Sequence, residues 1–223
     1  MVAFNTPLVA LAQCHDEQVR SLESAFHWVI DMGHGGLTRG KRSPVLPDGR
    51  QLLEWEFNAD IGRHVSERLT ALNIDHTLIP PDQANRGNDL AFRYTFANNL
   101  RVGKPKIFVS IHGNAGPAKK WSRKFRGIEC WHYYDSKTSQ RLAQIFQLHL
   151  IRATGAFDRG TKYKTERQFS VLANTTMPAV LTENLFFNND QEVKLMLDPA
   201  WRKKCAGGHV DAIKYIELNG IIL

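Results

Sequence analysis

The chain has 223 residues, of which 43% are hydrophobic and 23% are charged, and its net charge is +7. This composition is typical of a globular protein, and the length favours one domain with a sizeable core. The three cysteines are too few for a disulfide framework, and no apolar run approaches the ~18–20 residues of a membrane span. The basic charge favours an acidic partner, whether nucleic acid, an anionic membrane or a cell-envelope polymer.

Residues 1–25 are predicted to form an N-terminal extension, and residues 26–223 to form the single domain. No basic region precedes the apolar run at residues 7–14, so we expect synthesis in the cytoplasm without a clear signal peptide. The remaining elements are expected in this order: a short polar helix at 16–24, a strand at 26–31, a basic loop at 37–51, a helix at 52–72, a strand at 74–79, a helix at 88–101, a strand at 106–111, a basic aromatic loop at 117–126, a strand at 127–134, a helix at 136–153, strands at 169–173 and 179–183, and helices at 189–197 and 201–218.

Strands and helices therefore alternate along the chain. The helix at 52–72 shows the clearest pattern, because apolar side chains recur at helical spacing from Leu53 through Phe57 and Ile61 to Leu69. This alternation predicts an α/β fold, with a mixed, mostly parallel sheet of about six strands sandwiched between helices in a single domain.

Two histidines each follow a predicted strand. His34 lies in a Gly-His-Gly-Gly turn after the strand at 26–31, and His112 precedes a glycine after the strand at 106–111. Open α/β sheets bind ligands at the carboxyl ends of their strands, so two imidazoles there suggest one metal ion. A hydrolytic zinc site needs a third ligand and an open position for water. Glu54 or Glu56 supplies it, but they lie about 200° apart around a helix, so only one faces the metal.

A hydrolytic site also needs a base that is not a ligand. Glu183 ends the apolar run at 178–183, so its carboxylate is expected at the same sheet edge. Each of these residues also has a plain structural reading: a buried histidine, a first-turn acid that favours the helix dipole, or a surface carboxylate. Asp31 either orients a ligand histidine or caps a turn.

Six blocks of sequence carry a resemblance to one family. They are Ile30–Gly36 (IDMGHGG), Glu54–Asn58 (EWEFN), the set Arg86, Asp89, Leu90, Arg93, Ala97 and Asn98, Ser110–Ala115 (SIHGNA), Asp158–Gly160 (DRG) and Pro178–Asn189 (PAVLTENLFFNN). In this order and over residues 26–218, the chain resembles the zinc-dependent N-acetylmuramoyl-L-alanine amidases of the amidase_3 type. These form the catalytic domain of many bacterial cell-wall hydrolases and phage endolysins.

The resemblance implies that His34, Glu54 and His112 hold Zn²⁺ and that Glu183 is the catalytic base. It thereby selects Glu54 over Glu56. The implied reaction is hydrolysis of the amide between N-acetylmuramic acid and L-alanine in peptidoglycan. Asn114 and Arg159 become candidates for supporting the site or contacting substrate; Arg159 either forms a turn or meets a peptide carboxylate.

Some positions depart from the family pattern. Met32 replaces a proline, and Asn184-Leu185 replaces Thr-Gly after the catalytic glutamate; neither change removes a ligand. Some family members carry a long helical insertion that blocks the zinc. Here only residues 114–126 separate the second histidine block from the next strand, which predicts an open site.

Two other functions remain alternatives: a zinc carboxypeptidase acting on wall stem peptides, or a non-catalytic basic module that binds nucleic acid. For the amidase we expect no nucleic-acid partner and no transmembrane segment. The basic loops at 39–50 and 117–126 either face solvent or contact anionic wall polymers, with Trp121 and Phe125 available to stack on sugars. The setting is the cell wall, reached either as a phage endolysin or as a bacterial remodelling enzyme.

Overall fold

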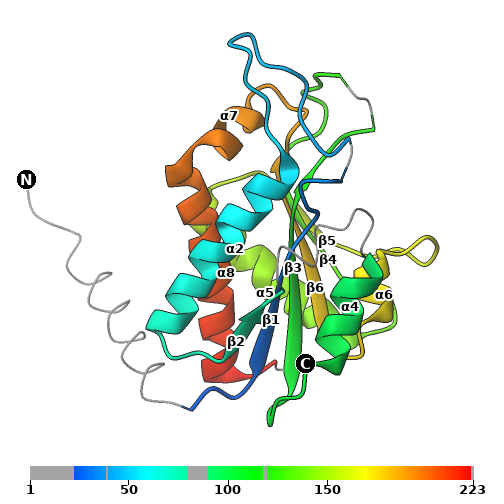
Figure 1. Cartoon of the computed structure of the whole chain (residues 1–223), viewed down its shortest axis with the longest axis vertical. Helices are drawn as coiled ribbons and strands as arrows, with labels where there is room; N and C mark the ends of the chain where they lie inside the picture. Colours follow the sequence, from blue (N-terminus) through cyan, green and yellow to red (C-terminus); the bar gives the residue numbers. More distant parts are fainter. Residues whose placement is uncertain (1–22, 39, 80–89, 118–119, 222–223) are drawn as a thin grey trace, which may run out of the picture.

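A six-stranded sheet forms the centre of the computed structural model, which describes residues 23–38, 40–79, 90–117 and 120–221 (Figure 1). The strand order is β2-β1-β3-β6-β4-β5. The strands are β1 (His27–Met32), β2 (His76–Leu78), β3 (Lys106–Asn114), β4 (Ile128–Trp131), β5 (Asp158–Lys162) and β6 (Ala179–Phe186). The helices are α2 (Glu54–Ala71), α4 (Leu90–Asn99), α5 (Lys137–Thr154), α6 (Ser170–Asn174), α7 (Glu192–Leu197) and α8 (Pro199–Asn219).

The sheet is mixed and mostly parallel, as predicted. β2, β1, β3 and β6 pair in parallel, and β4 pairs in parallel with β5. Only the β4–β6 pairing is antiparallel among the described strands. Because β1, β3 and β6 are parallel neighbours, their carboxyl ends lie together at one edge of the sheet.

Helices cover both faces of this sheet. Figure 1 shows α2, α5 and α8 against one face and α4 and α6 against the other. The larger core lies under α2, α5 and α8 and includes Trp28, Phe146 and Ile213, each fully buried. The smaller core joins Phe108 and Leu181 to side chains of α4 and α6. The α/β sandwich in a single domain is therefore confirmed.

Helix boundaries follow local chemistry. The Ser136 side chain accepts a hydrogen bond from the Ser139 amide at the start of α5, and Gly155 ends that helix with a φ of 66°. A left-handed φ is inexpensive for glycine and closes a helix by turning the chain away. The predicted helices at 52–72, 136–153 and 201–218 match α2, α5 and α8 within a few residues.

One predicted strand was wrong and one strand was not predicted. Residues 169–173 were expected to form a strand, but α6 covers Ser170–Asn174, since a short apolar run does not distinguish a helix from a buried strand. No strand was expected at residues 158–162, which form β5, the edge strand beside β4. The sheet keeps six strands because one error offsets the other.

Several predictions concern residues outside the described ranges. The short helix at 16–24 falls almost wholly there, as do Arg39, Arg86 and Asp89 and residues 118–119 of the second basic loop. The division into an extension at 1–25 and a domain at 26–223 stays a prediction. None of the described helices is both long enough and apolar enough to cross a bilayer.

Candidate metal centre

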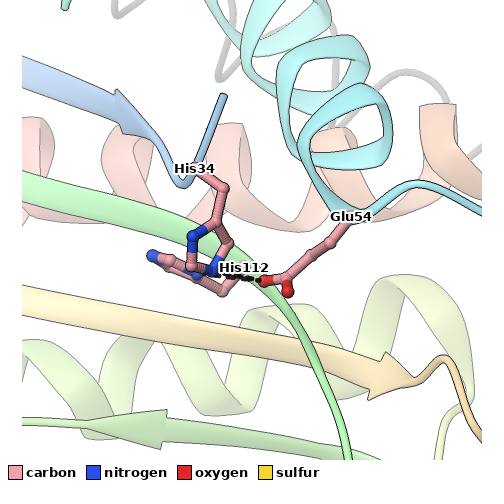
Figure 2. A group of neighbouring side chains, drawn as sticks. All are labelled: His34, Glu54 and His112. Atoms are coloured by element: carbon pink, nitrogen blue, oxygen red, sulfur yellow. Dashed lines mark hydrogen bonds and ion pairs between the residues drawn. The ribbon is translucent and has the colours of Figure 1, made fainter. Parts of the chain in front are cut away.

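His34, Glu54 and His112 meet at the edge of the sheet (Figure 2). Oε1 of Glu54 lies 3.2 Å from Nε2 of His34 and 3.1 Å from Nδ1 of His112. The two imidazoles stand edge to face, with their centroids 4.8 Å apart. Glu54 is buried, whereas Glu56 on the same helix is exposed, so the choice of Glu54 for this cluster agrees with the structure.

The backbone of the first histidine turn is held by Arg93. Its guanidinium donates to the carbonyl oxygens of Met32, at 2.8 Å, and His34, at 2.6 Å. Asp31 pairs with Arg93 and also accepts a hydrogen bond from the Ser110 hydroxyl at 2.6 Å. His34 itself has a φ of 64°, an unfavourable value for a residue with a side chain. Asp31 is therefore tied to the turn through Arg93, and no hydrogen bond or ion pair joins it to either imidazole in the described part of the chain.

The second histidine packs directly on Gly33. A Cβ placed at residue 33 would lie 2.2 Å from Cε1 of His112, far inside normal contact. The Gly33 carbonyl accepts a hydrogen bond from the Asn58 side chain at 2.8 Å, and the His112 carbonyl accepts one from the Asn184 side chain at 3.0 Å. Only glycine leaves the His112 ring its observed place.

The charge and the hydrogen bonding of this cluster suit a divalent cation. Burial alone would raise the pKa of Glu54, but hydrogen bonds from His112 and His34 outweigh it and lower the pKa to about 2. Burial lowers the pKa of His112 against the opposing pull of Glu54, which favours the neutral imidazole that a metal needs. Oε2 of Glu54 is buried and has no hydrogen-bond partner among the described residues. Two nitrogen donors and a carboxylate form a donor set that zinc commonly takes.

Glu183 lies beside this cluster on β6. It is in register with His112 on β3, and its side chain is almost fully buried. Burial raises the pKa of Glu183 well above its usual value, and the nearby charges of Glu54 and Glu129 raise it further. Its Oε2 also lacks a hydrogen-bond partner among the described residues. Such a carboxyl binds a proton more readily than an exposed glutamate and can exchange it with a bound molecule.

Glu129 is a site residue that the sequence analysis missed. It lies opposite Glu183 in the antiparallel β4–β6 pair, and it is buried. Its carboxylate accepts hydrogen bonds from the Asn114 side chain at 2.9 Å and from Nε of Arg159 at 2.6 Å. Asn114 and Arg159 therefore support this second carboxylate, and Arg159 belongs to β5 rather than to a turn. No motif marked Glu129; the only signal was an acid in a strand of otherwise apolar residues.

The cluster opens into a pocket of about 520 Å³. His34, Glu54, His112 and Glu183 all line it, and so do Lys41 and Phe169. The two aromatic side chains of the second basic loop contact other parts of the protein. Trp121 packs against the larger core, and Phe125 stacks on Phe186. A role for the basic loops in binding wall polymers stays a prediction.

The comparisons with known proteins agree with one another. The Amidase_3 family model, described as N-acetylmuramoyl-L-alanine amidase, matches residues 29–215. The chain is 34% identical over 188 residues to the endolysin of Bacillus phage SPP1, covering 84% of this chain and 64% of that protein. It is 29% identical over 209 residues to the N-acetylmuramoyl-L-alanine amidase LytC of Bacillus subtilis, covering 92% of this chain and 38% of that protein. The chain thus spans between about two fifths and just under two thirds of the length of these relatives.

Two solved structures give the same result for the fold. The N-acetylmuramoyl-L-alanine amidase from Clostridium difficile 630 superposes with a TM-score of 0.75 at 27% identity, covering 88% of this chain and 98% of that one. The catalytic domain of CwlV, an amidase from Bacillus (Paenibacillus) polymyxa, gives a TM-score of 0.69 at 27% identity, covering 88% and 99%.

Proposed function

Since the chain belongs to the Amidase_3 family of N-acetylmuramoyl-L-alanine amidases, we propose that it hydrolyses the amide between N-acetylmuramic acid and L-alanine in peptidoglycan. The observation that carries this proposal is the pocket itself. It brings three candidate metal ligands and a separate protonatable carboxyl to one sheet edge. Hydrolysis of an unactivated amide needs both, because the carbonyl must be polarised and the leaving amine must be protonated.

We propose zinc as the metal, held by His34, Glu54 and His112. When bound, zinc would polarise the amide carbonyl and lower the pKa of water toward ~7. The protein holds the ligands in place with a second set of contacts: Arg93 fixes the turn of His34, and Asn184 fixes the backbone of His112. Such supporting contacts commonly change metal affinity by ~10–100-fold when they are removed.

Glu183 performs the proton transfers in this proposal. It accepts a proton from the attacking water and returns it to the leaving nitrogen, which departs as the free amine of L-alanine. The raised pKa suits this role, because burial and the neighbouring carboxylates make Glu183 a stronger base than an exposed glutamate, so it takes up a proton more readily. Glu129 contributes to that raised pKa through like-charge repulsion across the β4–β6 pair.

Replacing Glu183 with alanine tests the proposal. We expect the Glu183→Ala variant to lose wall hydrolysis while it still binds one equivalent of zinc; Glu56→Ala, an exposed acid on α2, is the matched control and should keep both. Loss of zinc together with activity would make Glu183 a ligand. Mass spectrometry of digested walls identifies the bond: intact glycan chains with new L-alanine amino groups indicate the amidase, and released D-alanine indicates a carboxypeptidase instead.

The proposed place of action is the cell wall. We favour an endolysin that accumulates in the cytoplasm and reaches the wall when a holin opens the membrane, and similarity to a phage endolysin supports this setting. A bacterial remodelling amidase is the alternative, since LytC is similar over much of this chain. Expression inside a host cell with and without a holin separates the two, because lysis should require the holin in the first case.

A further inference from the structure

Arg159 is a candidate for binding a peptide carboxylate, but its side chain already pairs with a carboxylate of the protein itself. Nε of Arg159 donates to Oε2 of Glu129 at 2.6 Å, and Nζ of Lys162 lies 3.7 Å from the same oxygen. Glu129 is buried, so breaking these pairs would leave a charge without compensation. Arg159 and Lys162 therefore stabilise the protein's own carboxylate, and a substrate carboxylate must find other cations.

Lys41 is one such cation. It lines the pocket, and its backbone is fixed beside the metal cluster because its carbonyl accepts a hydrogen bond from the Glu54 amide at 3.0 Å. The neighbouring bridge between Arg42 and Leu53 anchors the same segment. The Lys41 side chain is exposed and forms no ion pair with a carboxylate in the described part of the chain.

Lys164 is the second cation. Its Nζ lies 4.4 Å from the ring centroid of Phe169 and 5.0 Å from that of Trp131. The two rings meet edge to face at 5.2 Å, and Phe169 lines the pocket. Trp131 is fixed in turn by a hydrogen bond to Glu129 at 3.1 Å. The aromatic pair thus holds an ammonium group at the pocket rim, where no described carboxylate forms an ion pair with it.

Both charges act on the centre of the pocket. Lys41 and Glu183 line the same pocket, and Lys164 lies over Phe169, which lines it too. The charges of both lysines also oppose the rise that burial and neighbouring carboxylates cause in the pKa of Glu183. A substrate whose scissile amide reaches Glu183 would place its adjacent groups within reach of these lysines.

We propose that Lys41 and Lys164 form a carboxylate-binding subsite that recognises an anionic peptide on the amine side of the scissile bond. This subsite rests on the proposed amidase function. Its ligand class is a peptide with free carboxylates, and the same peptide with amidated side carboxyls lacks the recognised charge. An ammonium group held over an aromatic pair and a second one on a backbone segment fixed beside the metal cluster favour the charged peptide by attraction and steer its approach.

The test compares two soluble muramyl peptides, one with free stem carboxylates and one with those carboxyls amidated. The wild-type protein should show a kcat/KM ratio of about 10 in favour of the free acid at low salt, and 0.5 M NaCl should reduce this ratio. The Lys41→Met/Lys164→Met double variant should bring the ratio close to one, mainly through KM. Methionine keeps the aliphatic stem of each lysine, so the fold is preserved.

Lys203→Met/Lys204→Met serves as the charge-matched control, because both lysines are exposed residues of α8 and neither lines the pocket. It should keep the wild-type ratio. An unchanged ratio in the Lys41/Lys164 variant, or the same change in the Lys203/Lys204 variant, would overturn the subsite while leaving the amidase intact. A wild-type protein that cleaves neither peptide nor intact wall would overturn the amidase function as well.

Discussion

Replacing Gly33 with alanine perturbs the metal centre without touching a ligand. The new Cβ would lie 2.2 Å from Cε1 of His112, whereas ordinary contact begins at 3.4 Å, so the imidazole must retreat by about 1.2 Å. His112 cannot easily shift as a whole, because the Asn184 side chain hydrogen-bonds to its backbone carbonyl and Glu54 hydrogen-bonds to Nδ1 of its ring. Moving a catalytic group by ~1 Å can cost ~100-fold in rate, and overpacking costs ~1–3 kcal/mol of stability.

We therefore expect Gly33→Ala to bind zinc at least ~10-fold more weakly and to clear purified walls ~100-fold more slowly. Zinc affinity is measured by competition with a chromophoric chelator, and clearing is measured at saturating zinc. Gly103→Ala is the matched control, since a Cβ there meets nothing within 4 Å. A Gly33→Ala protein with wild-type zinc affinity and clearing would refute the claim that close packing on Gly33 sets the position of His112.

Two further predictions concern Arg93 and His209. Arg93→Lys should weaken zinc binding by ~10-fold, because one ammonium group cannot donate to the carbonyls of both Met32 and His34 and still pair with Asp31. Competition titration with a chelator measures this loss, with Gly103→Ala as the control. Burial lowers the pKa of His209 to about 4 from 6.5, so the unfolded state binds a proton first as the pH falls, and stability is lost between those values. Urea unfolding from pH 7.5 to 4 should show a loss ~3 kcal/mol larger for wild type than for His209→Gln, and equal losses would exclude this role.

The three residues of the candidate metal centre could be predicted from the sequence. Strand ends and glycines marked His34 and His112, helical phase allowed only one of Glu54 and Glu56 to face the cluster, and the family resemblance selected Glu54. The structure brings all three together as expected. That they bind zinc, and that Glu183 transfers protons, are predictions that the experiments above test.

The contacts that support the candidate metal centre could not be predicted from local sequence in the same way. Glu129 reaches the site only because β4 runs antiparallel to β6, and no local pattern reveals the direction of a four-residue strand. The strand at 158–162 lacks apolar alternation, and its place in the sheet comes from pairing with β4 and from the Arg159–Glu129 contact. Long-range pairing of this kind overrides local propensity.

The position of β6 in the sheet has a consequence for the chain during synthesis. β6 is the last strand in sequence, yet it lies between β3 and β4 and carries the proposed base. A chain that stops before residue 179 has two separate groups of strands, with no strand to join them and no proton acceptor. We therefore expect partial products of translation that lack β6 to lack the proposed hydrolytic site, which is complete only once residues up to Phe186 have left the ribosome.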